Sequence, residues 1–182
     1  MLVTQGCFMT SLGMHIHTMS GKCQGILCAL ALVLLLASQS WAAVVVLDAG
    51  HGGGDQGTKW YGVAEKTITL DVAKRVETIL KRNGVTTVMT RRTDRSVSLE
   101  SRAAVANRNR NSLFVSIHFN ATRITAISGI ETYYRSDRGR RVAYTIQQSL
   151  MQKVTAKNRG IKRGNYAVLK HTRGTAVLVE CG

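Results

Sequence analysis

Four side chains that can bind a metal ion or transfer a proton stand at the ends of predicted elements. His51 follows the first apolar strand, His118 is the last residue of another strand, and Glu180 ends the last one. Glu65 stands at the start of the helix predicted after the loop that holds His51. In open α/β sheets, ligands bind outside the carboxyl ends of the strands. We therefore expect two imidazoles and two carboxylates on one rim of a sheet.

This set of side chains suits zinc, because two His and one Glu are a known ligand set of zinc hydrolases. A catalytic zinc site uses three protein ligands, and a further group must take a proton from water. Of the four candidates, three would bind the metal ion and one would act as the base. Asp55 competes with Glu65 as a ligand, since it is nearer to His51 in the sequence. A carboxylate at a helix start can also serve only the helix dipole.

A glycine-rich loop surrounds His51. Glycine adopts positive φ readily and has no side chain, so this loop would leave the floor beside a metal ion bare for a bulky polymeric substrate. A phosphate-binding loop is disfavoured because no Gly-Lys-Ser/Thr follows. An oxyanion loop of a serine hydrolase is disfavoured because the sequence has no Gly-x-Ser-x-Gly. The glycines are Gly50, Gly52, Gly53 and Gly54.

Other polar residues near this rim are candidates for supporting roles. Asp48 ends the first strand and would orient the loop or a histidine. Asn120 follows His118, and Glu131 lies on a later strand, from which it would reach the site or form a salt bridge. We assign Asp48, Asn120 and Glu131 to the layer around the metal ligands or to substrate binding. His171, in the basic segment KHTRGT, would line the rim or be exposed.

Residues 44–182 alternate short apolar runs with amphipathic stretches, and this alternation predicts an α/β fold. Strand–helix–strand order favours parallel pairing, with helices on both faces of the sheet. Asn83-Gly84 is a stop signal for the first helix. No internal repeat or linker is visible, so we expect a single domain. The predicted strands are 44–48, 85–90, 113–118, 129–134, 166–169 and 176–180, and the predicted helices are 66–82, 99–109 and 138–157.

Residues 1–43 have the features of a leader with a secretory signal peptide. Lys22 precedes an apolar run at 25–37, and the small residues of SQSWAA follow at 38–43. A positive flank, a short apolar core and small residues before a cleavage point describe such a peptide. The run is shorter than the ~20 residues of a membrane-spanning helix, and an uncleaved anchor is the alternative. We expect export to the periplasm, the cell wall or the outside of the cell.

The chain is strongly basic. Its formal net charge is +15, and because Lys22 is the one charged residue before residue 44, +14 remains on 44–182. Such a balance favours anionic surroundings. Export and an aromatic content of only 5% argue against nucleic acid and leave anionic wall polymers as candidate partners. Cys181 is the only cysteine after the leader, so neither an intramolecular disulfide nor a Cys-based zinc site is expected.

The residues around these candidates resemble successive blocks of one enzyme family. In order, the blocks are VVVLDAGHGGGDQGT, EKTITLDVAKRVETIL, TRRTDRSVSLESRAAVAN, LFVSIHFNA, GIETYY and VLVECG. Together they are similar to the zinc-dependent N-acetylmuramoyl-L-alanine amidases of the Amidase_3 type. The similarity covers essentially all of residues 44–182, which we therefore expect to be a zinc amidase catalytic domain.

The resemblance implies a mixed, mainly parallel sheet of six strands. It implies hydrolysis of the amide between N-acetylmuramic acid and L-alanine in peptidoglycan. It also implies one zinc ion held by His51, Glu65 and His118, with Glu180 as the catalytic carboxylate, and this decides for Glu65 over Asp55. We expect a monomer that acts on peptidoglycan.

Two features depart from the family pattern. The family usually continues after Glu180 with Gly-Phe-x-Ser-Asn and a last helix, whereas the sequence ends at Gly182. We expect that this last C-terminal helix is missing and that apolar surface beside Glu180 is exposed. Some relatives in cell division carry a long inhibitory helical insert before the final strands. Here YYRSDRGRR runs directly into a helix, so we expect no such insert and an open site.

Overall fold

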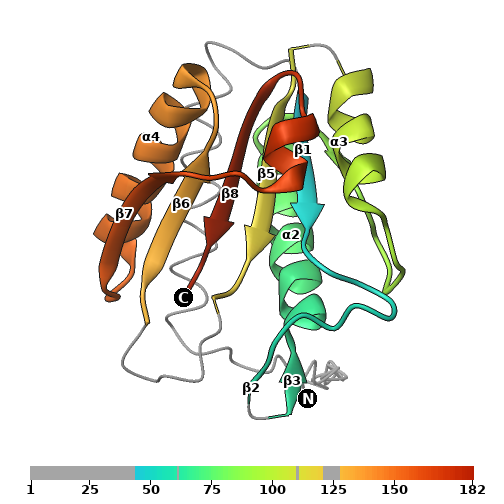
Figure 1. The fold of residues 1–182 in the computed structure, drawn as a ribbon, viewed down its shortest axis with the longest axis horizontal. Coiled ribbons are helices and arrows are strands. Elements are labelled where there is room, and N and C mark those ends of the chain that lie inside the picture. The colour runs from blue at the N-terminus through green and yellow to red at the C-terminus, as the bar shows by residue number, and fades with distance from the viewer. Residues whose placement is uncertain (1–43, 61, 110, 121–127) are drawn as a thin grey trace, which may run out of the picture.

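The computed structural model describes residues 44–60, 62–109, 111–120 and 128–182, so the predicted leader at 1–43 lies outside the described residues. Six strands of this part form one sheet in the order β4-β1-β5-β8-β6-β7 (Figure 1). β6 pairs antiparallel with β8, and the other four pairings are parallel. The predicted mixed, mainly parallel sheet is confirmed. Its strands are β1 (Val44–Ala49), β4 (Thr86–Met89), β5 (Leu113–His118), β6 (Ile130–Tyr134), β7 (Asn158–Arg163) and β8 (Thr175–Glu180).

The helices are α2 (Glu65–Arg82), α3 (Leu99–Arg108), α4 (Asp137–Lys153) and α5 (Ala167–His171). As predicted, they cover both faces of the sheet: α2 and α4 lie on one face, and α3 and α5 on the other (Figure 1). Successive strand residues point to opposite faces. In β1, Val45 and Leu47 therefore join the apolar cluster under α2 and α4, while Val46 joins the cluster under α3 and α5.

The long helices begin or end at residues that the sequence marks. α2 is followed by Asn83 and by Gly84, whose φ of 76° is the left-handed conformation that favours glycine after a helix. α3 and α4 begin after Ser98 and Ser136, and each hydroxyl accepts a hydrogen bond from the backbone N–H three residues later. Such caps pair N–H groups that a helix leaves without partners.

Two predictions on the late part of the chain are wrong. The apolar run at 166–169 was expected to be a strand, but it belongs to the helix α5, where Val168 and Leu169 are buried against the sheet. Short apolar runs do not distinguish a strand from a buried helix. The strand β7 was not predicted, because its sequence NRGIKR has a single large apolar residue, Ile161. It is an edge strand, where charged side chains are common.

The segment between β6 and β8 is described throughout, and it contains only α4, β7 and α5. The predicted absence of a long helical insert in this segment is therefore confirmed. A two-stranded hairpin, β2 (Lys59–Trp60) and β3 (Val63–Ala64), leads directly into α2. Within the described part of the chain, each helix is too short or too polar to span a membrane.

Candidate functional site

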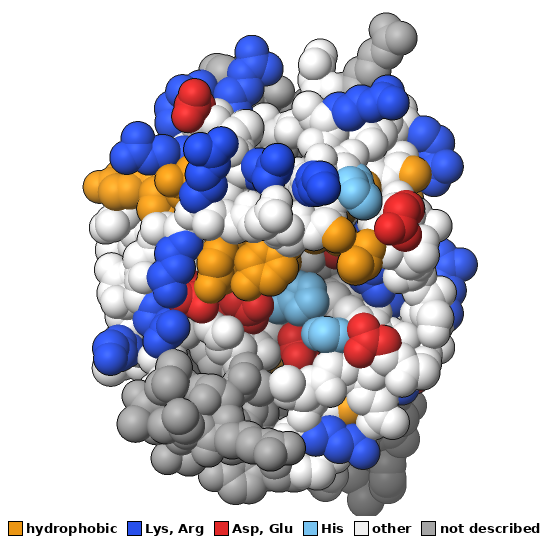
Figure 2. All heavy atoms as spheres, viewed as in Figure 1, with side chains coloured by type: hydrophobic (Ala, Val, Ile, Leu, Met, Phe, Trp, Pro, Cys, Tyr) orange, Lys and Arg blue, Asp and Glu red, His pale blue; other side chains and the backbone are white. Residues whose placement is uncertain are grey.

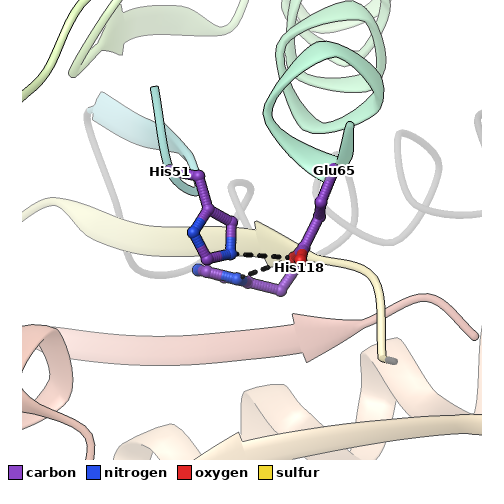
Figure 3. Close-up of side chains that lie close together, drawn as sticks. All are labelled: His51, Glu65 and His118. Atoms are coloured by element: carbon purple, nitrogen blue, oxygen red, sulfur yellow. Dashed lines mark hydrogen bonds and ion pairs between the residues drawn. The ribbon is translucent and has the colours of Figure 1, made fainter. Parts of the chain in front are cut away.

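His51, Glu65 and His118 meet at one point, although they come from three different elements (Figure 3). His51 lies in the loop after β1, Glu65 is the first residue of α2, and His118 is the last residue of β5. Oε1 of Glu65 lies 3.1 Å from Nε2 of His51 and 3.1 Å from Nδ1 of His118. One donor atom from each of the three residues lies within 4.8 Å of the other two.

This donor set fits a zinc ion. Atoms bound tetrahedrally to zinc at ~2.1 Å lie ~3.4 Å from one another, and the separations of 3.1 Å between the Glu65 oxygen and the two ring nitrogens are close to that value. Two imidazoles and one carboxylate also leave one coordination position open. Among the described residues, no second group of three His, Cys, Asp or Glu donors lies as close together.

Glu65 is buried and held in the ionised form. Burial alone would raise its pKa, but hydrogen bonds with His118 and His51 outweigh burial and hold the pKa of this carboxyl well below its usual range. The other oxygen, Oε2, accepts hydrogen bonds from the backbone N–H and the hydroxyl of Thr58, at 3.1 and 3.0 Å. Both oxygens are therefore fixed in place, which is what a metal ligand at a helix start requires.

Asp55 lies on the outer side of His51. Its Oδ2 is 2.9 Å from Nδ1 of His51, while Nε2 of the same ring faces Glu65. The hydrogen bond with Glu65, helped by the one with Asp55, raises the pKa of His51. Asp55 competed with Glu65 as a ligand in the sequence, but the structure sets it against the ring nitrogen that points away from the cluster. A carboxylate in that place orients the ring.

The loop that carries His51 has a strained backbone that two buried arginines hold. His51 has a φ of 61°, which is uncommon for a residue with a side chain. Arg102 donates to the carbonyl oxygen of His51 at 2.6 Å, and Arg91 donates to that of Gly50 at 2.8 Å. Both arginines also donate to the carbonyl oxygen of Ala49, at 2.7 and 3.0 Å. Three consecutive carbonyl groups are thus fixed by two guanidinium groups.

Asp48 supports this loop through Arg102. Its Oδ1 accepts hydrogen bonds from Nη1 of Arg102 at 2.8 Å and from the hydroxyl of Thr90 at 2.6 Å, and Oδ2 accepts one from Ser116 at 2.7 Å. Asp48 is fully buried. Of the two roles considered for it, orienting the loop and orienting a histidine, these contacts serve the loop.

Glycines allow close packing at the site. Not all of the glycines that were predicted to do this are involved. A Cβ atom at Gly50 would lie 2.4 Å from the ring of His118, and one at Gly57 would lie 2.7 Å from both Glu65 and His51. Gly57 was not among the predicted glycines. By contrast, Gly52 and Gly53 do not form the floor beside the three donors. They pack against Arg95 and Ser96.

Glu180 lies beside His118, because the two residues are register partners in the parallel pair of β5 and β8. Its side chain is 9% exposed, and among the described residues no group lies within hydrogen-bonding distance of the buried atom Oε2. Burial, together with the nearby charge of Glu65, raises the pKa of Glu180 to about 7, although the charge of His118 opposes this. A carboxyl group with a pKa near neutrality can both accept and return a proton.

Glu131 and Asn120 form a separate polar cluster. Oε1 of Glu131 accepts hydrogen bonds from Asn120 at 3.1 Å and from the hydroxyl of Tyr133 at 2.8 Å. Oε2 pairs with Arg159 at 3.0 Å and with Lys162. Of the two possibilities for Glu131, the structure shows the salt bridge. The amide group of Asn120 donates to Glu131.

His51, His118 and Glu180 open into a cavity of about 290 Å³. Figure 2 shows this hollow with two His side chains on its floor and hydrophobic side chains along one edge. The predicted open site is therefore present among the described residues. The apolar part of the lining comes from the start of α3 and the loop before it, from α5 and the residue before it, and from β8. It consists of Val97, Leu99, Tyr166, Ala167, Val168 and Leu178.

One residue considered in the sequence, His171, lies apart from this cavity. His171 is exposed at the end of α5, where its carbonyl group accepts a hydrogen bond from Asn107 at 2.9 Å. Arg91 and Arg102 were not foreseen as parts of the site. Both stand in the block TRRTDRSVSLESRAAVAN, and the signal that could have found them is an arginine in an otherwise apolar or helical pattern, at a position that must be buried.

Comparisons with known proteins agree on one family. The family model described as N-acetylmuramoyl-L-alanine amidase, Amidase_3, matches residues 45–182. The protein YqiI of Bacillus subtilis is 38% identical over 164 residues, which cover 86% of this chain and 79% of YqiI. The probable cell wall amidase LytH of Staphylococcus aureus is 39% identical over 142 residues, which cover 76% of this chain and 47% of LytH. The chain thus spans about half the length of LytH.

A solved structure shares the fold. The crystal structure of an N-acetylmuramoyl-L-alanine amidase from Clostridium difficile 630 matches with a TM-score of 0.73 and 37% identity. The match covers 79% of this chain and 81% of that one.

Proposed function

The chain belongs to the Amidase_3 family of N-acetylmuramoyl-L-alanine amidases, and we propose that it hydrolyses the amide bond between N-acetylmuramic acid and L-alanine in peptidoglycan in a zinc-dependent reaction. One observation carries this proposal: two residues of the metal-donor cluster, His51 and His118, line the same cavity as Glu180, whose buried Oε2 has no hydrogen-bond partner among the described residues. A site for binding alone would not need the carboxylate without a partner.

In the proposed site, His51, Glu65 and His118 bind the zinc ion, and Glu180 is the catalytic carboxylate. Asp55 keeps the ring of His51 turned so that Nε2 faces the ion. Arg102, which Asp48 holds, and Arg91 fix the carbonyl groups of the loop. When bound, zinc supplies a Lewis acid that polarises a carbonyl oxygen and favours the ionisation of water.

Glu180 moves the protons of the reaction. Its Oε2 takes a proton from the attacking water, whose oxygen forms a bond to the carbonyl carbon of the amide. The carbon–nitrogen bond then breaks, and Glu180 returns a proton to the nitrogen that leaves with L-alanine. A pKa near 7 suits a group that must do both. The absence of a hydrogen-bond partner on Oε2 among the described residues keeps this atom available.

The remaining proposals concern where and on what the protein acts. We propose that residues 1–43 act as a leader for export and that the protein works in the cell wall or periplasm as a monomer. The name of LytH, a probable cell wall amidase, supports this location. The charge of +14 on residues 44–182 supports contact with anionic wall polymers, and the proposed export and the aromatic content of 5% argue against nucleic acid.

The proposed function is tested by mass spectrometry of peptidoglycan digested with the purified chain. We expect glycan strands with free lactyl groups and peptides with a new amino-terminal L-alanine. A chelator should abolish both products, and added zinc should restore them. Glu180→Gln is the matched control, because it should retain zinc and yet form no product. Products in which L-alanine is still joined to muramic acid, or full turnover in the chelator, would contradict the proposal.

A further inference from the structure

A second cavity, of about 280 Å³, lies at the other end of α5, and cationic side chains surround it. Arg135, Arg163, Lys170 and Arg173 line it, and no Asp or Glu is among its lining residues. All four cations are exposed at the surface. Like charges so close together repel one another, and an anion bound between them would relieve that repulsion.

The neighbouring basic residues are neutralised, whereas these four are not. On β7, Arg159 and Lys162 both pair with Glu131. The next residue, Arg163, has no carboxylate partner among the described residues, and the same holds for Lys170 and Arg173. Arg135 contacts only a neutral group, the side-chain oxygen of Asn165, at 2.8 Å. The cavity therefore gathers cations that have no carboxylate partner among the described residues.

The helix α5 separates this cavity from the active-site cavity. Ala167 and Val168 line the active-site cavity, and Leu169 and Lys170 line the cationic one. The five residues of α5 rise ~7.5 Å along the helix axis, so the two cavities lie about that far apart. Figure 2 shows a band of Lys and Arg side chains on the same face as the hollow that holds the histidines. A ligand in the cationic cavity would thus lie beside a substrate.

We infer that the four residues form an anion-binding site that holds phosphate or carboxylate groups of the wall polymer while a neighbouring amide is hydrolysed. The identity of the polymer rests on the proposed function. Guanidinium groups bind both kinds of anion with paired hydrogen bonds. Peptide carboxylates of peptidoglycan and phosphodiesters of an attached wall polymer share this chemistry. Contact at this site would raise the local concentration of substrate and would not change the chemical step.

The test compares two triple variants of the full chain that lose the same charge. Arg163→Gln, Lys170→Gln and Arg173→Gln together remove three cations of the cavity. Binding to purified cell walls is measured by co-sedimentation at 4 °C, where turnover is slow. At physiological salt we expect about tenfold weaker binding, because three exposed ion pairs of ~0.5 kcal/mol each are lost. On intact walls, KM should rise to a similar extent with kcat unchanged.

The matched control removes Lys74, Arg82 and Lys153, which are exposed on α2 and α4 over the other face of the sheet. This control should bind walls like the unchanged chain. A second control, Arg163→Lys with Arg173→Lys, keeps the charges and should retain most of the binding. Melting temperatures show that each variant is folded. Equal wall binding by the two triple variants would overturn the inference.

Further binding measurements identify the anion. If the defect disappears on walls stripped of phosphodiester polymer, phosphates are the ligand, and if it persists, peptide carboxylates are. Loss of binding to vesicles of anionic lipid with unchanged binding to walls would overturn the inference in favour of a membrane surface. A failure of the proposed function would look different, since no variant would then hydrolyse peptidoglycan, whatever its affinity for walls.

Discussion

Glu131 and Glu180 are opposite one another on the paired strands β6 and β8, yet they stand in contrasting environments. Both are buried, with 3% and 9% of the residue exposed. Four side chains donate hydrogen bonds to Glu131. Burial would raise the pKa of Glu131, but these hydrogen bonds, above all that of Lys162, outweigh it and lower the pKa to about 2. Oε2 of Glu180 has no donor among the described residues, and burial raises its pKa to about 7.

This contrast shows that burial alone does not decide whether a carboxyl group is ionised. The hydrogen-bond donors around the group decide it. Glu131 is fixed as an anion and links β6 to the edge strand β7. Glu180 is left free to exchange a proton beside the metal donors. The ion pairs of Glu131 stabilise the fold, whereas in the proposed reaction Glu180 would transfer protons at a cost in stability.

The largest expected effect comes from Glu180→Gln. The amide has the shape of the carboxyl group but cannot accept the proton of water, so we expect kcat to fall ~10³-fold. Zinc content, measured by mass spectrometry of the bound metal, should stay at that of the unchanged chain. Residual activity above a tenth would assign the proton transfer to another group.

The next effect is on stability, and it comes from Glu131→Gln. This change leaves Arg159 and Lys162 without their carboxylate, and breaking a buried ion pair lowers the free energy of unfolding by ~3 kcal/mol. Urea unfolding measures the change. Glu100→Gln is the matched control, since Glu100 is exposed in the first turn of α3, and it should change stability by less than ~0.5 kcal/mol. Equal effects of the two substitutions would show that the Glu131 cluster does not stabilise the sheet.

In the metal-free protein, the two carboxyl groups should change stability in opposite directions with pH. The folded pKa of Glu131, about 2, lies below its unfolded value near 4.5. Its stabilisation is therefore complete above pH 4.5 and is lost as the pH falls toward 2. The folded pKa of Glu180, about 7, lies above its unfolded value, so ionising it lowers stability progressively as the pH rises from 4.5 to 7.

Each contribution amounts to ~3 kcal/mol. Urea unfolding of chelator-treated protein across this pH range measures both. In Glu180→Gln the loss between pH 4.5 and 7 should disappear, and this variant should be more stable than the unchanged chain at pH 8. If the stability of Glu180→Gln still fell between pH 4.5 and 7, the raised pKa would not belong to Glu180.

The smallest effect sharpens the comparison within the Glu131 cluster. Tyr133→Phe removes one of the four donors, the hydroxyl at 2.8 Å, and keeps the ring. The loss of one hydrogen bond among four should lower the free energy of unfolding by ~1 kcal/mol. The measurement is urea unfolding of Tyr133→Phe, of Glu131→Gln and of the double variant. If Tyr133 acts through Glu131, the double variant should be no less stable than Glu131→Gln alone.

Much of the fold could be predicted because its central strands are continuous apolar runs. β1, β5 and β8 are buried on both faces, and each reads as a strand from its residues alone. β7 could not be predicted from local sequence, since its residues Arg159 and Lys162 are placed by ion pairs with Glu131, which is distant in the chain. The prediction of a strand at 166–169 was wrong, because apolar residues such as Val168 and Leu169 are buried equally well in a strand and in a helix.

The candidate site was predictable to the extent that it lies at strand ends. His51, His118 and Glu180 follow from the sheet topology, and Glu65 follows from the helix start. The arginines that hold the His51 loop did not follow, because a buried arginine needs main-chain carbonyl groups whose direction appears only when the loop has folded. The close contact of Gly57 with Glu65 depends in the same way on the path of the loop.

The short helix α5 has a consequence for how such enzymes can diversify. The metal donors and Glu180 lie on α2, β5, β8 and the loop after β1, whereas α5 contributes to the walls of both cavities. Changing the exposed residues of 166–174, while keeping the buried Val168, Leu169 and Thr172, would alter the walls of both cavities and leave the core under the sheet intact. The walls of the two cavities can therefore change in sequence while the metal donors stay in place.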